Sequence, residues 1–562
     1  MKEYQEPYRD LYDMLRVSAE RFPAKAAVID DRESVIYAEM KRRVDALAGL
    51  LREKYGLRQG MQAGILMVNS AKTLIAFYAL AKLGCIAVMI NTKYRAAEIR
   101  DLLASMEVRI ILCDGMWTEK VFETAERNGI PVLAADEMLP EKEAAESGTG
   151  PAGTEAAETA APRDPETEKQ PSPEKTENAD LPVVIMHTSG TTGKPKGIMV
   201  TQRNIMEAAY GYREVQGLGA DDITVLSVPL FHILGLSCVS TLFIYIGGTI
   251  VLSSFYKAED VLRKIRKYKA THFHSVPAIY LQLLAAWKAE QMPDTVREEN
   301  AAVEQVLSGK EAAARPLDTI RTAICGGAPI SQEDADEVCV MIPNAVFRRA
   351  YGMTETAGSG TLSAKHKGPL MAVPNMFCTV EDTEHRMLPP GQMGEIVFHG
   401  TPVARGRWEA EDLPDDAMYS GDVGYMDEEG HVFVVDRVKD IINRGGEKIF
   451  PKKIETLIEQ FPGIRRAAVY AFRSPGYGEE PAAAIIPEEG ESPDPEELRH
   501  FLKERIATFE MPVRFSLRER FPVTENGKVR KAVLRAELEE KLYGTESPAG
   551  AIPKERKETG AE

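Results

Sequence analysis

The amino-acid sequence predicts an α/β fold with more than one domain, and three observations support this prediction. The chain has 562 residues, more than a single hydrophobic core usually holds. Hydrophobic residues make up 44% of it, which is enough to fill large cores. Between residues 8 and 136, segments with helical spacing alternate with short apolar runs, a pattern typical of a substantially parallel sheet.

The segments follow each other in a clear order. Apolar residues recur with helical spacing and predict helices at Leu11–Arg21, Ala38–Leu51, Ala71–Leu83 and Ala96–Met106. Short apolar runs between them predict strands at Ala26–Ile29, Gly64–Val68, Cys85–Ile90 and Val108–Leu112. Later strand-like runs are Val183–Met186, Thr322–Cys325, Ala467–Tyr470 and Ala482–Ile486, and Pro495–Ile506 completes a C-terminal region of strand and helix pieces.

Charge and cysteine content exclude several classes of function. The net charge of −17 argues against nucleic acid or an anionic membrane surface as the main partner. The six cysteines are scattered without metal-site spacing, so we expect reduced, mostly buried thiols in a cytoplasmic protein. The polar first residues contain no apolar run of the kind an export signal needs.

One long segment carries no charged side chain. Val225 to Leu252 meets the usual length for a membrane span, but Pro229, Gly235 and Gly247-Gly248 interrupt it. We therefore predict a buried loop, helix and strand here and no transmembrane segment.

A second segment, residues 141–181, is poor in aromatic and branched aliphatic residues. It has eleven acidic and four basic residues, a net charge of −7. Such a composition cannot bury enough surface to offset the entropy of ordering, so we predict a disordered acidic insertion that the chemistry does not need.

The segment with the most distinctive chemistry is His187–Gly197, with the sequence His-Thr-Ser-Gly-Thr-Thr-Gly-Lys-Pro-Lys-Gly. Glycines let backbone N–H groups approach an anion, hydroxyls add donors, and Lys194 or Lys196 adds positive charge. A polar surface loop is the ordinary alternative. The spacing is not that of a P-loop, because only two residues separate Gly190 from Gly193. We expect a phosphate-binding loop of another kind.

Thr188–Gly197 resembles the signature loop of the adenylate-forming superfamily, which contains acyl-CoA synthetases, luciferases and the adenylation domains of peptide synthetases. The resemblance implies that this loop clamps the triphosphate of ATP and that Thr192 also takes part in catalysis. The loop residues concerned are Thr188, Ser189, Gly190, Thr191, Thr192, Gly193 and Lys196.

His232 follows the loop in Val228-Pro-Leu-Phe-His232. A lone histidine is more often structural than functional. In the resembling acyl-CoA synthetases, however, an aromatic–His pair lies beside the carboxylate substrate, whereas amino-acid-activating relatives carry an Asp in this region. The apolar neighbours of His232 disfavour an amino-acid substrate.

Two further motifs occur in the order found in the superfamily. Gly326–Ile330 alone predicts only a turn, but the resemblance implies that Gly327, Ala328 and Pro329 line the adenine. Tyr351-Gly-Met-Thr-Glu-Thr356 offers an aromatic plane, a hydroxyl and a hard carboxylate.

The resemblance assigns the residues of that second motif individually. It implies that Tyr351, Gly352, Met353 and Thr354 contact the nucleotide and that Glu355 binds Mg²⁺ on the triphosphate. Just before the motif, Arg348-Arg349 departs from the usual small or amide residues.

The last motifs lie toward the C-terminus. The resemblance implies that Asp422 binds the ribose hydroxyls and that Arg437 also takes part in nucleotide binding, although Gly406–Tyr419 lacks the usual Gly-Trp. Lys439 would be the hinge and Gly446 would border the passage for the pantetheine arm of CoA.

Lys528 follows an Asn-Gly pair, which by itself predicts a hairpin turn with an exposed lysine. In the resembling enzymes this lysine enters the active site and stabilises charge on the α-phosphate. The resemblance implies a large N-terminal domain of packed α/β subdomains, a small mobile α+β C-terminal domain and a short tail. Their residues are 1–438, 439–542 and 543–562.

The resulting hypothesis is an ATP- and Mg²⁺-dependent ligase that joins a fatty or aryl carboxylic acid to CoA through an acyl-adenylate. Three alternatives stay open: an adenylating enzyme that loads a carrier protein, a luciferase-like oxygenase and a non-catalytic nucleotide-binding relative. A homodimer is also left open. The sequence does not identify the acid.

Overall fold

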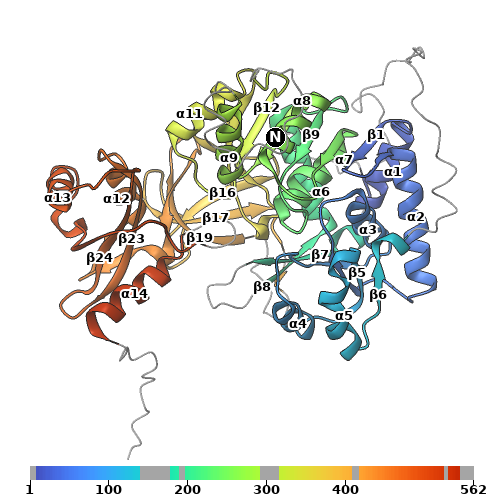
Figure 1. Cartoon of the computed structure of the whole chain (residues 1–562), viewed down its shortest axis with the longest axis horizontal. Helices are drawn as coiled ribbons and strands as arrows, with labels where there is room; N and C mark the ends of the chain where they lie inside the picture. Colours follow the sequence, from blue (N-terminus) through green and yellow to red (C-terminus); the bar gives the residue numbers. More distant parts are fainter. Residues whose placement is uncertain are drawn as a thin grey trace, which may run out of the picture. The chain divides into compact units, whose positions relative to one another are not determined.

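We describe the protein from a computed structural model, shown in Figure 1. The structure describes residues 8–138, 177–188, 196–290, 316–404, 406–407, 417–523 and 529–544. The chain divides into two compact units. Unit 1 comprises residues 1–379, 397–418 and 429–432, and unit 2 comprises 380–396, 419–428 and 433–562. The boundary expected at 438/439 falls inside the last segment of unit 2.

Unit 1 contains a seven-stranded sheet with the order β18-β8-β7-β4-β3-β5-β6. The strands β3, β4, β5, β6 and β7 run parallel, whereas β8 pairs antiparallel with β7 and with β18. In chain order they are β3 (Gln62–Leu66), β4 (Ile86–Met89), β5 (Val108–Cys113), β6 (Val132–Ala134), β7 (Pro182–Thr188), β8 (Lys196–Thr201) and β18 (Gly406–Arg407).

Helices pack beside this sheet, and two of them, α3 (Ala71–Lys82) and α4 (Ala96–Ala104), lie at predicted positions, whereas α5 (Thr118–Arg127) was not predicted. Helix α3 is buried along most of its length and contacts β3 and β4. Helices α4 and α5 contact each other and lie beside β5 and β6 (Figure 1). Apolar residues from α4, α5 and these strands form one hydrophobic core.

The second sheet has thirteen strands among the described residues, and those that lie wholly in unit 1 follow the order β15-β14-β13-β12-β11-β9-β10-β1-β2. These strands are β1 (Ala26–Ile29), β2 (Ser34–Ile36), β9 (Ile223–Leu226), β10 (Thr249–Leu252), β11 (His272–Ser275), β12 (Thr322–Cys325), β13 (Val346–Gly352), β14 (Gly360–Ser363) and β15 (Leu370–Ala372). From β1 to β13 the pairing is parallel, and β2, β14 and β15 join antiparallel.

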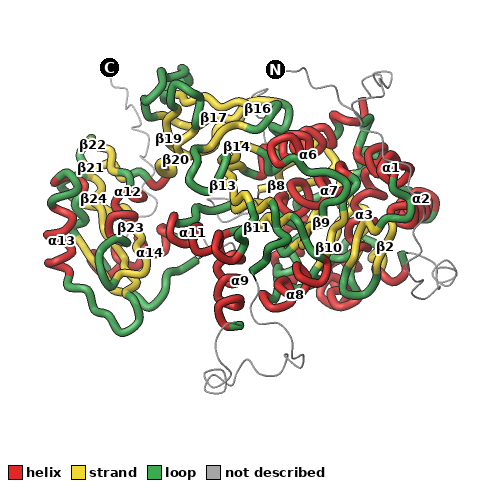
Figure 2. Tube along the Cα trace, turned by 90° about the horizontal axis from the view of Figure 1, so that it is seen from above, coloured by secondary structure: helices red, strands yellow, loops and turns green. Residues whose placement is uncertain are grey.

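Three groups of helices pack around this second sheet. Helices α8 (Ala258–Tyr268), α9 (Pro277–Ala289) and α11 (Gln332–Met341) share a hydrophobic core with its strands. Helix α6 (Gln202–Gln216) contacts the π-helix η6 (Leu234–Thr241) and α7 (Leu242–Ile246), and Figure 2 shows α6 and α7 next to each other. Helices α1 (Leu11–Arg21) and α2 (Tyr37–Glu53) also pack together.

Unit 2 contains a mixed sheet in which β24 (Gly478–Pro487) pairs with β21 (Ile442–Arg444), β23 (Ile464–Ser474) and β25 (Arg514–Leu517). Strand β22 (Glu447–Ile449) forms a hairpin with β21. Helices α12 (Pro451–Ile458) and α13 (Pro495–Lys503) pack into its main core, and α14 (Lys531–Tyr543) contacts β23. Unit 2 also holds parts of β16 (Met376–Glu381), β17 (Gly394–Gly400), β19 (Ala417–Met426) and β20 (Val432–Arg437).

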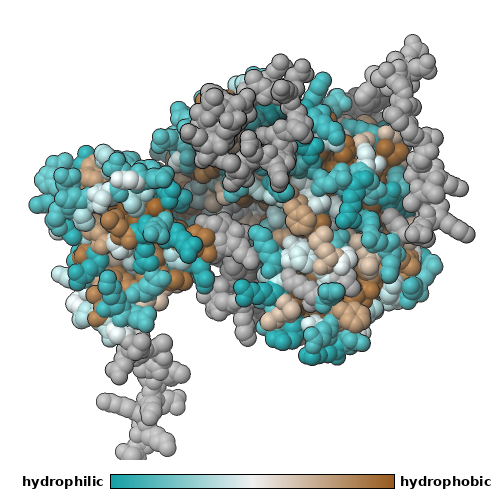
Figure 3. All heavy atoms as spheres, in the orientation of Figure 1, coloured by the Kyte–Doolittle hydropathy of each residue, from teal (hydrophilic) through white to brown (hydrophobic). Residues whose placement is uncertain are grey.

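Most predicted elements are confirmed. The segment Val225–Leu252 forms β9, η6, α7 and β10, as predicted, and among the described residues no helix has the length and apolar character needed to cross a bilayer. The six cysteines are free, and all except the partly exposed Cys339 are buried. On the face shown in Figure 3, hydrophilic side chains cover much of the described surface, with apolar patches between them.

The predicted disordered insertion requires one correction. Most of it lies outside the described residues, but Glu177–Asp180 forms a 3-10 helix. Ala179 is buried, and Asp180 pairs with Arg203 of α6 at 2.8 Å between Oδ1 and Nε. This local burial and ion pairing order the end of the segment despite its composition.

Candidate functional site

The predicted phosphate loop connects two paired strands. Thr188 ends β7 and Lys196 begins β8, and the antiparallel register pairs these two residues. Five predicted loop residues, Ser189, Gly190, Thr191, Thr192 and Gly193, lie outside the described residues. The structure therefore fixes both ends of the loop, close together at one end of a buried strand pair.

The Tyr351–Thr356 motif lies at the end of β13. The Tyr351 ring packs against Phe398 with 5.3 Å between ring centroids. The 3-10 helix η8 (Thr354–Thr356) follows and contacts β8. Glu355 is half-buried on η8, and its carbonyl oxygen accepts a hydrogen bond of 2.7 Å from the Ala404 N–H. A carboxylate on η8 thus lies near the strand that leaves the phosphate loop, as a metal ligand on a triphosphate requires.

Gly326–Pro329 leaves the neighbouring strand β12. Because β12 and β13 are parallel, with Cys325 opposite Arg349, this segment and the Tyr351 motif leave the sheet at the same edge. In open α/β sheets, ligands bind at the carboxyl edge of the strands. Gly327 has a φ of +78°, which a side chain would strain, so glycine suits this turn. The structure therefore brings two predicted nucleotide-binding segments side by side.

His232 lies just before η6 and is half-buried. Its ring is 4.7 Å from the Phe231 ring, centroid to centroid. Burial, together with the positive charge of Lys93, lowers the pKa of His232 to about 4. The imidazole is therefore neutral at pH 7, and one of its nitrogens can donate a hydrogen bond to a carboxylate oxygen.

The buried residue Asn69, which the sequence did not single out, holds the loop before His232. Its amide nitrogen donates to the Val228 carbonyl at 2.9 Å, and its amide oxygen accepts from the Leu230 N–H at 2.8 Å. Asn69 precedes the N-cap of α3, where an asparagine has no distinctive sequence pattern. Only the long-range contacts show that it positions the His232 loop.

Arg348 has a structural role that explains part of the departure from the superfamily pattern. Its guanidinium donates to the carbonyls of Ser363 at 3.1 Å and Val215 at 3.3 Å, and also to that of Ala364. Val215 lies in the last turn of α6, whose carbonyls lack partners within the helix. Arg348 therefore ties the end of α6 to β14.

Asp422 and Arg437 lie together in unit 2. Asp422 is buried, and its Oδ1 is 3.2 Å from the Arg437 Nε. The Ser420 hydroxyl accepts from the Asp422 N–H at 3.1 Å, which fixes the backbone at this point. Asp422, predicted to bind the ribose, and Arg437, predicted to contact the nucleotide, thus form an ion pair in which the arginine orients the carboxylate.

The predicted hinge, the predicted CoA passage and the predicted catalytic lysine also belong to unit 2. Lys439 lies in the 3-10 helix η9 (Val438–Asp440). Gly446 lies in the turn between β21 and β22 with a φ of +99°. Lys528 lies outside the described residues, but Val523 and Val529 on either side of that gap pair through an antiparallel bridge.

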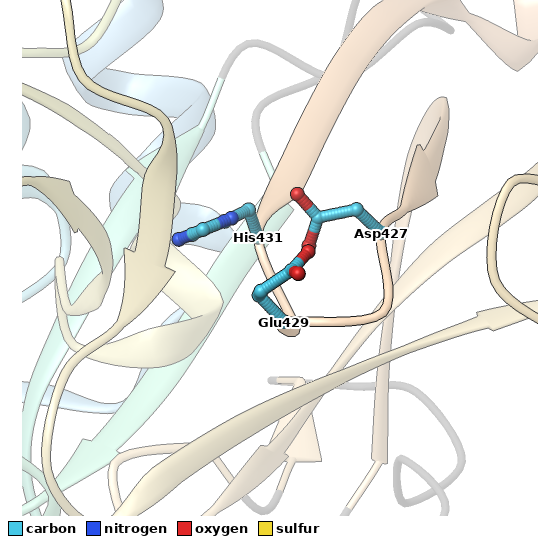
Figure 4. Close-up of side chains that lie close together, drawn as sticks. All are labelled: Asp427, Glu429 and His431. Atoms are coloured by element: carbon cyan, nitrogen blue, oxygen red, sulfur yellow. The ribbon is translucent and has the colours of Figure 1, made fainter.

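A small group of possible metal ligands lies on the turn between β19 and β20. Asp427, Glu429 and His431 each offer one ligand atom, and these atoms lie within 4.8 Å of one another (Figure 4). Glu429 is exposed, and acidic groups commonly gather on exposed turns without a metal. We assign this group no role.

Comparison with known proteins gives a consistent result over nearly the whole chain. Residues 15–408 match the family model described as AMP-binding enzyme, and residues 453–528 match the AMP-binding enzyme C-terminal domain. A feruloyl-CoA synthase from Amycolatopsis is 30% identical over 533 residues, which is 91% of this chain and 96% of the relative. A 2-succinylbenzoate–CoA ligase from Bacillus licheniformis is 30% identical over 92% of this chain and 97% of the relative.

Solved structures agree with these matches. The o-succinylbenzoate CoA synthetase of Bacillus subtilis, in complex with its acyl-adenylate intermediate, superposes with a TM-score of 0.73 and 25% identity. The match covers 93% of this chain and 97% of that chain.

Proposed function

The chain belongs to the AMP-binding enzyme family as an ATP-dependent carboxylate–CoA ligase, and from this premise we propose how its residues divide the reaction. In the first half-reaction a carboxylate oxygen attacks the α-phosphorus of ATP, and the bond to the pyrophosphate leaving group breaks. In the second, the thiolate sulfur of CoA attacks the acyl carbonyl carbon, and the bond to AMP breaks. The products are an acyl-CoA thioester, AMP and pyrophosphate.

The loop between β7 and β8 would hold the β- and γ-phosphates. Its hydroxyls and backbone N–H groups, with Thr192 and Lys196 among them, would neutralise and orient the leaving pyrophosphate. The half-buried Glu355 carboxylate near β8 fits a ligand for Mg²⁺, which when bound would offset negative charge on the triphosphate. The single observation that carries this assignment is the contact between η8 and the strand that leaves the loop.

The adenine and the ribose of the nucleotide would each contact their own group of residues. Tyr351 and Gly327–Pro329 leave one edge of the sheet and would enclose the adenine, with Gly352, Met353 and Thr354 completing the wall. Asp422, oriented by Arg437, would accept hydrogen bonds from the ribose hydroxyls. The neutral His232 imidazole would donate a hydrogen bond to the substrate carboxylate without holding it as tightly as a charged group would.

Lys528 would stabilise the negative charge that develops on the α-phosphate during adenylation, because its ammonium group lies on a flexible side chain that can approach that charge. Rotation of a C-terminal domain, residues 439–542, about Lys439 would then replace Lys528 by the turn at Gly446, where the pantetheine arm enters. These steps extend the family assignment to individual residues.

An aromatic acid is the substrate class we favour. The feruloyl and 2-succinylbenzoate ligases act, by their names, on aryl acids, and each is 30% identical to this chain over 91% or 92% of its length. The buried Ile233 and Leu236 beside His232 suit an apolar ring. A fatty acid is the second candidate within the same class of reaction.

Two features of the cellular context are also proposals. Five buried cysteines and the partly exposed Cys339, all free, suit a reducing compartment, and we propose a cytoplasmic enzyme. Whether the enzyme forms a homodimer is to be measured by analytical ultracentrifugation.

A carrier protein as acyl acceptor is the main functional alternative, because loading its phosphopantetheine uses the same first half-reaction.

The test measures AMP release with CoA across short-chain, long-chain and aryl acids, for the unaltered enzyme and for Lys528→Ala. We expect at least one acid to give turnover and Lys528→Ala to lower kcat/KM for adenylation about 10²- to 10³-fold. Lys541→Ala, which removes an exposed lysine of α14, is the matched control. Thioester formation from synthetic acyl-adenylate should persist in Lys528→Ala.

Two outcomes contradict the proposal. If no acid supports AMP formation above the Lys528→Ala level, the non-catalytic alternative replaces it. If acyl transfer occurs to a phosphopantetheinyl carrier protein but not to CoA, the carrier-loading alternative replaces it.

A further inference from the structure

Asn204 is a buried amide at the start of α6. It is the third residue of the helix and is 2% exposed. Its amide oxygen accepts from the Thr201 N–H at 2.9 Å, and the Thr201 hydroxyl accepts from the Asn204 N–H at 3.1 Å. Thr201 is both the last residue of β8 and the N-cap of α6. This reciprocal pair therefore fixes the junction between the strand that leaves the predicted phosphate loop and the helix that follows.

The amide nitrogen of Asn204 contacts a segment that lies 197 residues away along the chain. It donates to the Thr401 carbonyl at 2.7 Å and to the Val403 carbonyl at 2.9 Å. The segment 401–404 follows β17 and forms a turn, because the Val403 N–H donates to the Gly400 carbonyl at 3.1 Å. Both donors and the acceptor of the Asn204 amide are therefore paired, as a buried amide requires.

The segment 401–404 leads to the proposed metal ligand. Ala404 is buried, and its N–H donates to the Glu355 carbonyl at 2.7 Å. Glu355 lies in η8, which contacts β8. A set of hydrogen bonds thus connects β8, the start of α6, the segment 401–404 and η8, all within unit 1. The Asn204 side chain joins the two halves of this set.

A second buried side chain on the same face of α6 supports this arrangement. Glu207 follows Asn204 by three residues, a spacing that places both on one side of a helix. It is 3% exposed, and its carboxylate accepts from the side-chain amide of Asn375. Asn375 lies against Gly400, because a Cβ on Gly400 would be 2.1 Å from the Asn375 carbonyl oxygen. One face of α6 therefore holds both the segment 401–404 and the residue before it.

This connection bears on where the Glu355 carboxylate lies relative to the phosphate loop. Mg²⁺ demands near-octahedral coordination, so a carboxylate and phosphate oxygens that share the ion tolerate little displacement. A shift of about 1 Å in a group that positions the reactants can lower a rate about 10²-fold. The alternative is a purely structural role, in which Asn204 only caps α6 and anchors a loop.

We propose that Asn204 is a positioning residue for adenylation, which holds the Glu355 backbone in place relative to the strand that leaves the phosphate loop. This inference rests on the proposed function, in which Glu355 binds the metal on the triphosphate. It assigns Asn204 to the first half-reaction and gives it no part in the second.

The first test is a binding measurement on Asn204→Asp, which keeps the shape of the side chain and the oxygen for the Thr201 N–H but lacks both donors. The probe is Mn²⁺, which shares the preference of Mg²⁺ for carboxylate oxygens. Its binding to the enzyme with α,β-methylene-ATP is measured by electron paramagnetic resonance, and we expect the Kd to rise about tenfold. The added negative charge alone would tighten cation binding, so weaker binding reports displaced ligands.

The second test compares the two half-reactions of Asn204→Asp, with the acid that the unaltered enzyme uses best. We expect kcat for AMP formation to fall about 10- to 100-fold. Thioester formation from synthetic acyl-adenylate contains no triphosphate, so its rate should stay within about threefold of that of the unaltered enzyme.

Two control variants separate positioning from stability. Thr201→Val removes the capping hydroxyl but leaves the Asn204 amide in place, so it should lower the melting temperature without raising the Kd for Mn²⁺. Asn344→Asp removes an exposed amide that donates to the Asp318 carbonyl at 2.9 Å, and it should change neither readout. If thermal unfolding shows that Asn204→Asp does not fold, Asn204→Ser decides, because serine is uncharged and too short to reach the segment 401–404.

The outcomes distinguish this inference from the proposed function. An unchanged Kd for Mn²⁺ in the Asn204 variant, with only a lower melting temperature, contradicts the inference and leaves the ligase assignment intact. Equal losses in AMP formation and thioester formation contradict it as well, because Asn204 would then support the fold as a whole. If the unaltered enzyme forms AMP with no acid, the proposed function fails and the inference fails with it.

Discussion

The two units use glycine near the candidate site for different reasons. In unit 1, Gly352 ends β13, and a Cβ there would lie 2.3 Å from the Ser359 carbonyl oxygen. In unit 2, Gly446 has a φ of +99°, but nothing lies within 4 Å of the position of its Cβ. Space requires the first glycine, whereas backbone conformation favours the second. We therefore expect a side chain at Gly352 to destabilise unit 1 strongly. A side chain at Gly446 should destabilise unit 2 only slightly.

The largest expected effect is that of Gly352→Ala. The added methyl must displace the backbone at Ser359, and we expect the free energy of unfolding to fall by about 3 kcal/mol. The measurement is urea-induced unfolding, with Gly49→Ala in α2 as the control because nothing lies within 4 Å of its Cβ position. A urea unfolding curve left unchanged by Gly352→Ala would contradict the contrast between the two glycines.

A smaller effect concerns pH, because unit 1 buries His272 in its core. Burial, with a contribution from Arg321, lowers the pKa of His272 to about 3. Below pH 6.5 the unfolded chain binds a proton that the folded chain excludes, so stability is lost as the pH falls from 6.5 toward 3. At pH 5 this histidine alone should cost about 2 kcal/mol.

This prediction is checked by the urea midpoint at pH 7 and pH 5 for the unaltered chain and for His272→Gln, which should show a weaker pH dependence. His500→Gln, on exposed helix α13 of unit 2, should leave the dependence as it is. If the urea midpoint changes equally between pH 7 and pH 5 in all three proteins, His272 does not contribute to the pH dependence of stability.

The smallest expected effect is that of Gly446→Ala. A side chain at positive φ costs about 1 kcal/mol, and no neighbour adds to that cost. We expect a small loss of stability, normal acyl-adenylate formation and slower thioester formation, measured as separate half-reactions. If adenylation and thioester formation fall together, the turn does not act selectively in the second step.

Local pattern predicts much of the secondary structure. The helix Leu11–Arg21 and the strand Ala26–Ile29 have the predicted bounds. Strand β3 begins two residues earlier than predicted because Gln62, a polar residue, is buried and accepts a hydrogen bond from the Glu107 N–H at 3.0 Å. It ends earlier because the Val68 N–H donates to the Asp114 carboxylate at 2.7 Å instead of continuing the ladder.

The candidate site is predictable only in part. The residues of the motifs are contiguous in sequence, so their chemistry and order are visible there. The supporting contacts of Asn69, Arg348 and Asn204 depend on residues far away along the chain. Pairwise contacts of this kind leave no periodic pattern, and only the fold brings the partners together.

The ion pair between Asp180 and Arg203 has a practical consequence for labelling the enzyme. It anchors the chain to α6 just before β7, so the register of the strand that leads into the phosphate loop is set by residues 177–188 themselves. A peptide tag or protease site introduced upstream, within residues 141–176, would be separated from the predicted phosphate loop by this anchor. Lengthening a loop raises the entropic cost of closing it only slightly. Such insertions should therefore label the protein without changing its turnover.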